Sequence, residues 1–217
     1  IALSQSELYQ QSRDAQASAE NLLLNILPRD IASRLQHEPH PIADRFEAVT
    51  ILFADIVDFT GLAAGTTPTA LVELLNRIFS TFDQLADRYG LEKIKTIGDA
   101  YMVVGGLPHP RADHAVAVAE MAIAMQAAIA EFHRADGQPF AIRIGMSTGP
   151  VVAGVIGLRK FIYDLWGDAV NTASRMESHG LVGGIQVTHE TYVLLRDRFD
   201  FCDRGEIQIK GKGTMHT

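Results

Sequence analysis

The sequence has little of what several protein classes require. It contains one cysteine, Cys202, among 217 residues, so it can form neither an internal disulfide nor a cysteine-rich zinc site. No apolar run approaches the roughly 20 residues of a membrane-spanning helix, and no signal-peptide pattern precedes the polar start. Positive charge is also scarce, because 19 basic residues against 26 acidic ones give a formal charge of −7. That balance argues against a nucleic-acid partner.

Several catalytic motifs are absent as well. No GxxxxGK precedes a Ser or Thr, and no GxGxxG opens a helix after a strand, so P-loop and dinucleotide-binding interpretations lack support. Eight histidines occur without HExxH spacing, which gives no support to zinc catalysis. The whole chain is 47% apolar and 21% charged, which is the balance of an ordinary globular domain.

The N-terminal residues are predicted to be helical. The first residue is Ile1 rather than Met, so we expect a piece of a longer protein. Residues 3–24 lack Gly and Pro and carry a weak heptad row of Leu8, Ala15 and Leu22. They form either a solvated tail or the end of a signalling helix that pairs with its copy. Pro28 is expected to close this element, and a short helix is expected over residues 30–35.

Hydrophobic periodicity predicts alternating strands and helices in the rest of the chain. The expected strands are 49–56, 91–97, 100–105, 140–147, 151–156 and 184–187, and the expected helices are 71–85, 118–132 and 168–176. The order β-α-β-β-α-β, with a hairpin at Gly98-Asp99, predicts an α+β fold. We expect a ferredoxin-like antiparallel sheet with helices on one face.

Two aspartates are candidates for a metal site. Asp55 ends a strongly apolar strand, where a carboxylate is costly unless it binds a cation or gains hydrogen bonds. Asp99 lies in the tight turn between two strands, so the carboxylates converge if the first strand lies beside that hairpin. Such a pair suits Mg²⁺ or Mn²⁺ completed by substrate phosphates. The alternative, that each aspartate only caps a helix or turn, stays open on pattern alone.

Three segments resemble the class III nucleotidyl cyclase catalytic domain: residues 53–60, 93–102 and 163–176. The resemblance implies a helical lead-in or signalling linker over residues 1–44 and a catalytic domain over 45–217. It also implies a homodimer with two shared active sites that cyclise ATP or GTP to the 3′,5′-monophosphate. Residues 24–28 resemble the lead-in of membrane-bound members, so an upstream membrane or sensor region fits outside this chain.

The resemblance assigns the metal ligands, next to a phosphate site that the residues themselves suggest. Asp55 and Asp99 match the two metal-binding aspartates, and the backbone carbonyl of Ile56 matches a third ligand. Two Mg²⁺ or Mn²⁺ ions per site are implied, one lowering the pKa of the 3′-hydroxyl and the other neutralising the triphosphate. Phe59 and Thr60 follow at a strand-to-helix turn, whose backbone N–H groups suit a phosphate.

The resemblance also predicts which base is bound. Lys95 matches the base-specifying lysine and Asp164 its partner, and this donor and acceptor fit N1 and the N6 amine of adenine. Guanylyl-type members carry Glu and a small residue such as Cys there, so ATP is the predicted substrate. Strand alternation places Lys93 on the same face as Lys95, and only the resemblance selects Lys95.

The remaining matches concern the ribose and the phosphates. Asn171 and Arg175, four apart on a predicted helix, match the pair that orients the ribose and stabilises charge on the α-phosphate. Arg159 and Lys210 match triphosphate-binding residues.

The chain departs from the family in two places. Asp58 stands where members usually carry Gly, and its charge either slows phosphate binding or points outward harmlessly. The sequence also stops at residue 217, where the family commonly continues into one more strand.

We therefore expect an adenylate cyclase, a phosphorus–oxygen lyase that acts in the cytoplasm. A guanylyl cyclase is the alternative within the enzymes. A nucleotide sensor or dimerisation module without turnover is disfavoured, because both metal aspartates and the Asn/Arg pair are retained. A diguanylate cyclase is disfavoured because its Gly-Gly-Asp/Glu-Glu-Phe turn is absent.

Overall fold

The computed structural model describes residues 5–37, 41–157 and 160–217. Two compact units emerge, one drawn from residues 1–44 and 154–164 and the other from 45–153 and 165–217. The described helices are α1 (Gln5–Leu24), α2 (Arg29–His37), α3 (Phe59–Ala64), α4 (Pro68–Tyr89), α5 (His114–Ala130), α6 (Asp168–Ser178) and α7 (His189–Leu195). The described strands are β1 (Ala43–Ile56), β2 (Glu92–Ile97), β3 (Ala100–Gly105), β4 (Ile142–Ile156), β5 (Ile162–Trp166), β6 (Ile185–Val187), β7 (Glu206–Ile209) and β8 (Gly213–His216).

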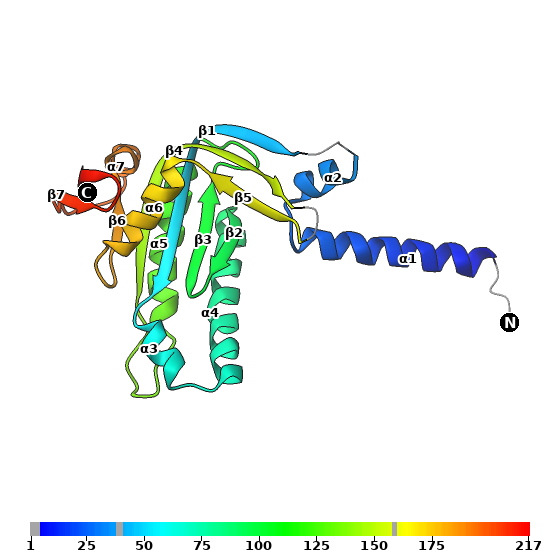
Figure 1. The fold of residues 1–217 in the computed structure, drawn as a ribbon, viewed down its shortest axis with the longest axis horizontal. Coiled ribbons are helices and arrows are strands. Elements are labelled where there is room, and N and C mark those ends of the chain that lie inside the picture. Colours follow the sequence, from blue (N-terminus) through cyan, green and yellow to red (C-terminus); the bar gives the residue numbers. More distant parts are fainter. Residues whose placement is uncertain (1–4, 38–40, 158–159) are drawn as a thin grey trace. The chain divides into compact units, whose positions relative to one another are not determined.

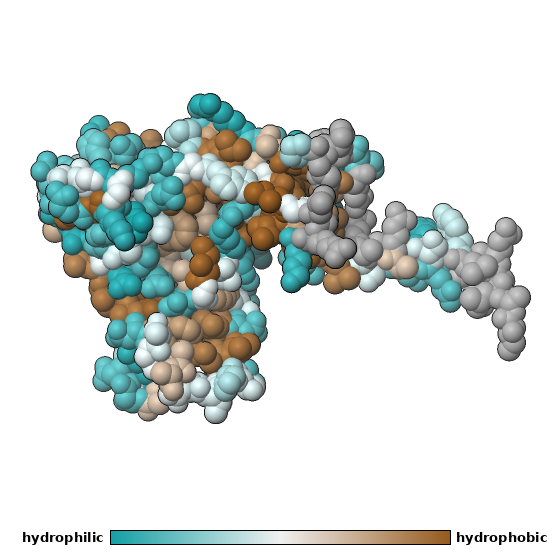
Figure 2. All heavy atoms as spheres, viewed as in Figure 1, coloured by the Kyte–Doolittle hydropathy of each residue, from teal (hydrophilic) through white to brown (hydrophobic). Residues whose placement is uncertain are grey.

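The smaller unit contains the two N-terminal helices. Both were predicted, but α1 ends at Leu24, before Pro28, and the Pro28 carbonyl accepts the first hydrogen bond of α2 from Ala32 N–H at 2.9 Å. Of the predicted heptad row, Leu8 has a side chain outside the described residues, whereas Ala15 and Leu22 are exposed. Figure 2 shows mainly hydrophilic side chains along the coloured part of α1. Pairing of this helix with a copy stays a prediction.

The larger unit is built on the predicted sheet. Within this unit the strand order is β2-β3-β1-β4, and β6 pairs in parallel with β4 (Figure 1). β1 and β2 each pair with β3 in antiparallel fashion, and the register places Asp55 opposite Ala100. The ferredoxin-like α+β fold is thereby confirmed, since the β-α-β-β-α-β core has the order that this topology requires.

One face of the sheet forms the core with α4 and α5. Leu52 and Ala54 of β1 alternate toward this face, and Tyr101 and Val103 of β3 do the same. α4 contributes an amphipathic stripe that contains Ile78 and Phe82. Thr67 caps its first turn through Ala70 N–H, and Gly90 ends it at φ 64°, a left-handed conformation that glycine adopts without strain. The core therefore leaves the odd-numbered side chains of β1, Asp55 among them, on the opposite face.

The predicted break between two strands at Gly149-Pro150 was wrong. Residues 140–147 and 151–156 were expected to form separate strands, but β4 runs without interruption from Ile142 to Ile156 through Gly149-Pro150. Pro150 is exposed, and proline is tolerated in a strand where its nitrogen needs no ladder hydrogen bond. The Gly-Pro pair is therefore part of the strand.

α6 packs on the face of β4 opposite to α4 and α5. A Cβ built on Gly145 would lie 1.9 Å from the backbone nitrogen of Glu177 and 2.5 Å from the carbonyl oxygen of Ala173. The absence of a side chain at Gly145 thus allows the helix backbone to approach the strand directly. This close contact determines the position of α6, and of its side chains, relative to β4.

We expect Gly145→Ala to destabilise the protein strongly. Because the added methyl would overlap helix backbone rather than a flexible side chain, the loss should reach about 3 kcal/mol, or roughly 6–12 °C in the unfolding midpoint. Gly61→Ala is the matched control, because its Cβ would have no atom within 4 Å and Ala is favoured over Gly in a helix. Thermal unfolding of both variants checks this, and an unchanged midpoint for Gly145→Ala would contradict the packing.

Candidate active site

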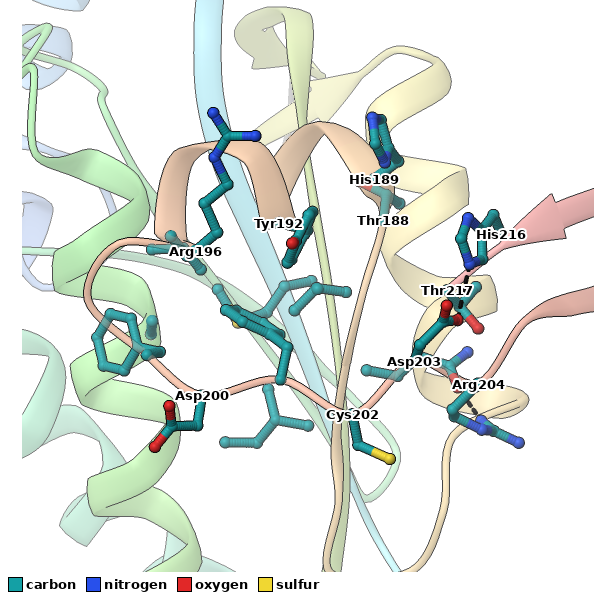
Figure 3. A pocket seen from close by; sticks show the side chains of 18 of the residues that line it. Thr188, His189, Tyr192, Arg196, Asp200, Cys202, Asp203, Arg204, His216 and Thr217 are labelled. Atoms are coloured by element: carbon teal, nitrogen blue, oxygen red, sulfur yellow. Dashed lines mark hydrogen bonds and ion pairs between the residues drawn. The ribbon is translucent and has the colours of Figure 1, made fainter.

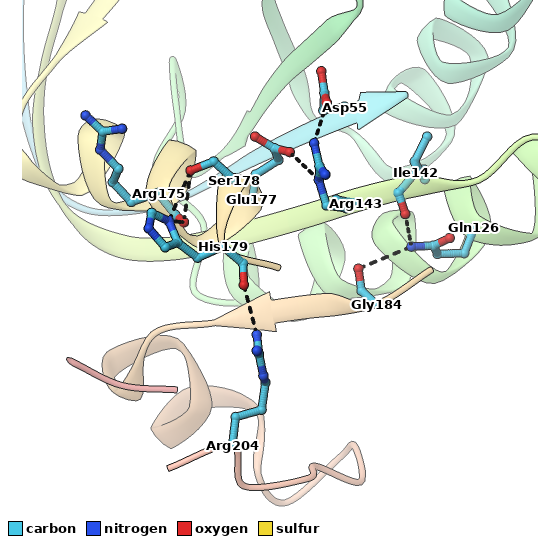
Figure 4. A network of polar contacts seen from close by, with 10 residues as sticks. All are labelled: Asp55, Gln126, Ile142, Arg143, Arg175, Glu177, Ser178, His179, Gly184 and Arg204. Carbon is cyan, nitrogen blue, oxygen red and sulfur yellow. Dashed lines mark hydrogen bonds and ion pairs between the residues drawn. The ribbon is translucent and has the colours of Figure 1, made fainter. Parts of the chain in front are cut away.

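Asp55 lies near the end of β1 and is partly buried. Arg143 of β4 donates from Nη2 to Asp55 Oδ2 at 3.0 Å, and from Nε to Glu177 Oε1 of α6 at 3.1 Å (Figure 4). The Asp55 and Arg143 side chains are 21% and 31% exposed, so solvent screens their interaction only in part. One guanidinium thus connects two strands and a helix at this point.

Asp99 lies at the same end of the sheet, in the turn between β2 and β3. Burial raises the pKa of the Asp55 carboxyl above its usual range, and the negative charge of Asp99 raises it further, while Arg143 opposes the change. A like charge acts in this way only at short range. The structure therefore brings the two predicted metal ligands together, and it leaves their ligand role as a prediction.

Glu177 completes this cluster and was not predicted. Burial raises the pKa of its carboxyl, whereas the hydrogen bond from Arg143 lowers it. The sequence placed Arg143 on the polar side of an alternating strand, which was the available signal that its charge needs a partner. Its two partners are distant in sequence, so the pattern alone did not reveal them.

The turn after β1 carries three of the predicted residues. Ile56 ends β1 with its side chain buried, so its contribution to a ligand would come from the backbone. Phe59 begins α3 and packs into the core, while Thr60 is exposed. Because the first hydrogen bond of α3 runs from Leu62 N–H to the Asp58 carbonyl at 3.2 Å, the N–H groups of Phe59 and Thr60 precede the helical ladder.

The two lysines of β2 lie on opposite faces, contrary to the prediction that they share one. Lys93 pairs with Val103 and Lys95 with Met102, because a β-bulge shifts the register between them. Lys93 Nζ lies 2.7 Å from Asp83 of α4 on the core face. Lys95 therefore lies on the same face of the sheet as Asp55. The backbone register thus separates Lys95, which the resemblance had selected, from Lys93.

Asp164 and Arg159 belong to the stretch between β4 and the end of β5. Asp164 is half-buried on β5 within the smaller unit. Arg159 lies outside the described residues. The pairing of Asp164 with a base stays a prediction.

Asn171 and Arg175 lie on α6, as predicted. Asn171 is exposed and Arg175 is partly exposed, four residues further along the same helix. The Arg175 carbonyl accepts hydrogen bonds from the Ser178 hydroxyl and the His179 N–H at the end of the helix. The Arg175 guanidinium points away from these two residues (Figure 4). The helix thus presents an amide and a guanidinium on one face.

Lys210 lies in the exposed turn between β7 and β8. The neighbouring Lys212, rather than Lys210, contacts the carboxylate of Asp168 at the start of α6. The structure therefore connects this turn with α6, and it leaves a phosphate-binding role of Lys210 as a prediction.

A cavity of about 770 Å³ lies elsewhere, between α7 and the C-terminal residues (Figure 3). Its walls include Ile123, Tyr192, Phe199 and Phe201, with Arg204 at the rim. It contains none of the predicted site residues. The paired carboxylates, the arginine with two carboxylate partners and the carboxyl groups with raised pKa lie instead at the end of β1.

The donor set at the end of β1 fits a hard divalent cation. Asp55 and Asp99 offer carboxylate oxygens and Ile56 a carbonyl. A cation would offset both the burial and the repulsion from Asp99 that raise the pKa of Asp55. Within the described ranges, no cluster of three or more His, Cys, Asp or Glu side chains is arranged to hold a metal ion. The protein thus offers part of a coordination shell, which is usual for Mg²⁺ that also binds substrate phosphates.

The profile of the family described as "Adenylate and Guanylate cyclase catalytic domain" matches residues 42–217. The chain therefore belongs to the class III adenylate and guanylate cyclase catalytic domain family, as its three motifs predicted. Among its relatives, an adenylate cyclase of Mycobacterium tuberculosis is 52% identical over 200 residues, 92% of this chain and 45% of that protein. The rat guanylate cyclase soluble subunit beta-2 is 44% identical over 200 residues, 91% of this chain and 29% of that protein.

A solved structure has the same fold. The guanylate cyclase domain of a Catenaria anguillulae protein, in complex with GTP, superimposes with a TM-score of 0.77 at 38% identity, covering 80% of this chain and 95% of that one. The chain spans less than half the length of the curated relatives named above. Among the helices of the described residues, none combines the length and apolar character that crossing a bilayer requires.

Proposed function

We propose that this domain is an adenylate cyclase that converts ATP to 3′,5′-cyclic AMP and pyrophosphate. The observation that carries the proposal is the convergence of Asp55 and Asp99 at one sheet end, with Lys95 on the same face of the sheet. In the reaction, the ribose 3′-oxygen bonds to the α-phosphorus, the bond to the β-phosphate oxygen breaks, and the hydroxyl proton passes to solvent. The 52% identity to a protein named adenylate cyclase supports the choice of ATP.

Two divalent ions, Mg²⁺ or Mn²⁺, would be held by Asp55, Asp99 and the Ile56 carbonyl, and would supply charge neutralisation for the phosphates and acidification of the 3′-hydroxyl. The other roles belong to side chains and backbone of the chain itself. Phe59 and Thr60 bind a phosphate through their N–H groups, and Asn171 orients the ribose. Arg175 stabilises the charge that develops on the α-phosphate, because a guanidinium offers two parallel hydrogen bonds to phosphate oxygens.

Base choice rests on Lys95 and Asp164. A lysine donates to N1 of adenine and an aspartate accepts from its N6 amine, whereas guanine presents the reverse pattern. Arg159 and Lys210 add positive charge toward the triphosphate. These assignments come from matched motifs, supported for Lys95 by its position on the Asp55 face.

We further propose a homodimer with two active sites at its interface. One chain would contribute Asp55 and Asp99, and the other Lys95, Asp164, Asn171 and Arg175. Because all six residues occur in one chain, two copies carry two complete sites. The domain would act in the cytoplasm, where ATP is supplied, with any sensor or membrane region outside this chain.

Nucleotide turnover tests the proposal directly. The purified chain with Mn²⁺ should form cAMP from ATP at least about 10-fold faster than cGMP from GTP, since one mismatched buried group costs ~1–3 kcal/mol. Specific activity should rise with protein concentration and then level off as dimers form. An Asp99→Asn variant serves as the inactive control. Faster cGMP formation would instead identify a guanylyl cyclase, which is the second candidate because close relatives bear that name.

A further inference from the structure

Arg134 contacts the turn that follows β1 from a different part of the chain. Its Nη2 donates to the Val57 carbonyl at 3.0 Å and lies 3.7 Å from Asp58 Oδ2. The guanidinium also lies over the Phe140 ring, 5.5 Å from its centroid. Arg134 is 27% exposed and Asp58 is 75% exposed, so the arginine is the sheltered partner.

The segment that carries Arg134 is itself well anchored. Arg134 N–H donates to the Gln138 carbonyl and Phe140 N–H to the Phe132 carbonyl, each at 2.8 Å. The Ala141 carbonyl in turn accepts Val57 N–H at 2.9 Å. Both polar backbone groups of Val57 are therefore held from this segment, one by backbone and one by Arg134. The position of the turn depends on the segment between α5 and β4.

Asp58 makes this turn unusual. It is one of two non-glycine residues with a positive φ among those described, at φ 59° and ψ 22°. Asp and Asn tolerate this left-handed region better than most residues, and glycine adopts it freely. The conformation thus explains why a glycine would suit the position, and the aspartate adds a negative charge directly before the N–H groups of Phe59 and Thr60.

From these contacts we propose that Arg134 is a positioning residue for phosphate binding. It holds the Val57 carbonyl, and it draws the Asp58 carboxylate away from the place where a phosphate would meet the start of α3. The inference rests on the proposed function. An exposed pair at 3.7 Å adds little stability, but an uncompensated carboxylate beside a polyphosphate repels it. Arg134 therefore permits an aspartate where its charge would otherwise oppose the substrate.

A double-mutant cycle tests this inference. The full chain is compared as wild type, Arg134→Gln, Asp58→Asn and the double variant, with kcat and KM measured for ATP and Mn²⁺. Arg134→Gln should raise KM by about 10-fold with kcat changed less than about twofold, but in the Asp58→Asn background only by about two- to threefold. Asn retains the left-handed conformation, so this background removes the charge alone. Higher salt should shrink the difference between backgrounds.

Binding of inorganic tripolyphosphate with Mn²⁺, measured by isothermal titration calorimetry, provides a readout independent of turnover. Its Kd should follow the same pattern as KM. Arg77→Gln is the matched control, because the Arg77 guanidinium lies 5.5 Å from the Phe132 ring centroid in the same way but belongs to α4. Unfolding midpoints within a few degrees of wild type show that the variants fold.

The outcomes separate the two claims. If the wild type cyclises ATP and Arg134→Gln changes neither KM nor Kd, or changes them equally in both Asp58 backgrounds, the positioning role is overturned and the proposed function stands. If the wild type prefers GTP, the same cycle is measured with GTP, and only the base assignment is lost. A wild type that neither turns over a nucleotide nor binds tripolyphosphate would overturn both.

Discussion

Neither an Asp55→Ala chain nor an Asn171→Ala chain is expected to cyclise ATP alone, yet an equal mixture should recover about one quarter of the wild-type rate. Each parent homodimer has both sites damaged and should lose at least about 10³-fold in kcat, because it lacks either a metal ligand or the residue that orients the ribose for attack. Random pairing makes half of the dimers mixed, and each mixed dimer has one undamaged site. One quarter of all active sites in the mixture are therefore intact, and the rate should recover to that fraction.

The two substitutions should have a small effect on folding. Arg143 keeps its hydrogen bond to Glu177 when Asp55 is shortened, and Asn171 is exposed on α6. A mixture of Asp55→Ala with Asp99→Asn is the matched control, since both changes damage the same half of the site and no pairing can restore it. If mixed dimers form and the Asp55/Asn171 mixture stays as inactive as its parents, the shared site is refuted.

Replacement of the base-reading pair should reverse nucleotide preference. The double variant Lys95→Glu with Asp164→Cys is expected to turn over GTP faster than ATP, with the ratio of kcat/KM values shifting by on the order of 10²–10³. Glu accepts from the guanine N1–H, and removal of the aspartate ends the repulsion between its carboxylate and guanine O6. Measured kcat/KM values for both nucleotides with Mn²⁺ give the ratio directly.

The β-bulge supplies an internal control for that switch. Lys93→Glu removes an ion pair with Asp83 on the opposite face, so it should lower stability and leave the ratio of kcat/KM values within about threefold of wild type. The single variants Lys93→Glu and Lys95→Glu make the same chemical change at positions two residues apart. An equal shift in the ratio from Lys93→Glu and Lys95→Glu would contradict the assignment of Lys95.

Much of the scaffold was predictable because its signals are local. The glycine that ends α4, the turn at Gly98-Asp99 and the apolar run that ends β1 each determine a boundary without reference to distant residues. The meeting of Asp55 and Asp99 followed from adding one topological assumption, that β1 lies beside the hairpin. The structure shows this pairing directly in the register of β1 and β3.

The errors occur where a local pattern does not determine the structure. A bulge adds one residue to a strand without changing its composition, so alternation placed Lys93 and Lys95 on one face when they lie on two. The bridge from Arg143 to Asp55 and Glu177 joins residues 88 and 34 positions apart, and no periodicity reports contacts at such separations. The break expected at Gly149-Pro150 rested on turn preference, which an exposed position within a strand overrode.

The bulge in β2 also gives the two lysines of this strand, Lys93 and Lys95, different roles. Asp83 ties the first lysine to α4, and the extra residue, Ile94, turns the second outward. Nucleotide selectivity would then depend on a backbone irregularity as well as on side-chain identity. An insertion or deletion in this short strand could therefore change the substrate while every recognisable motif residue remained in place.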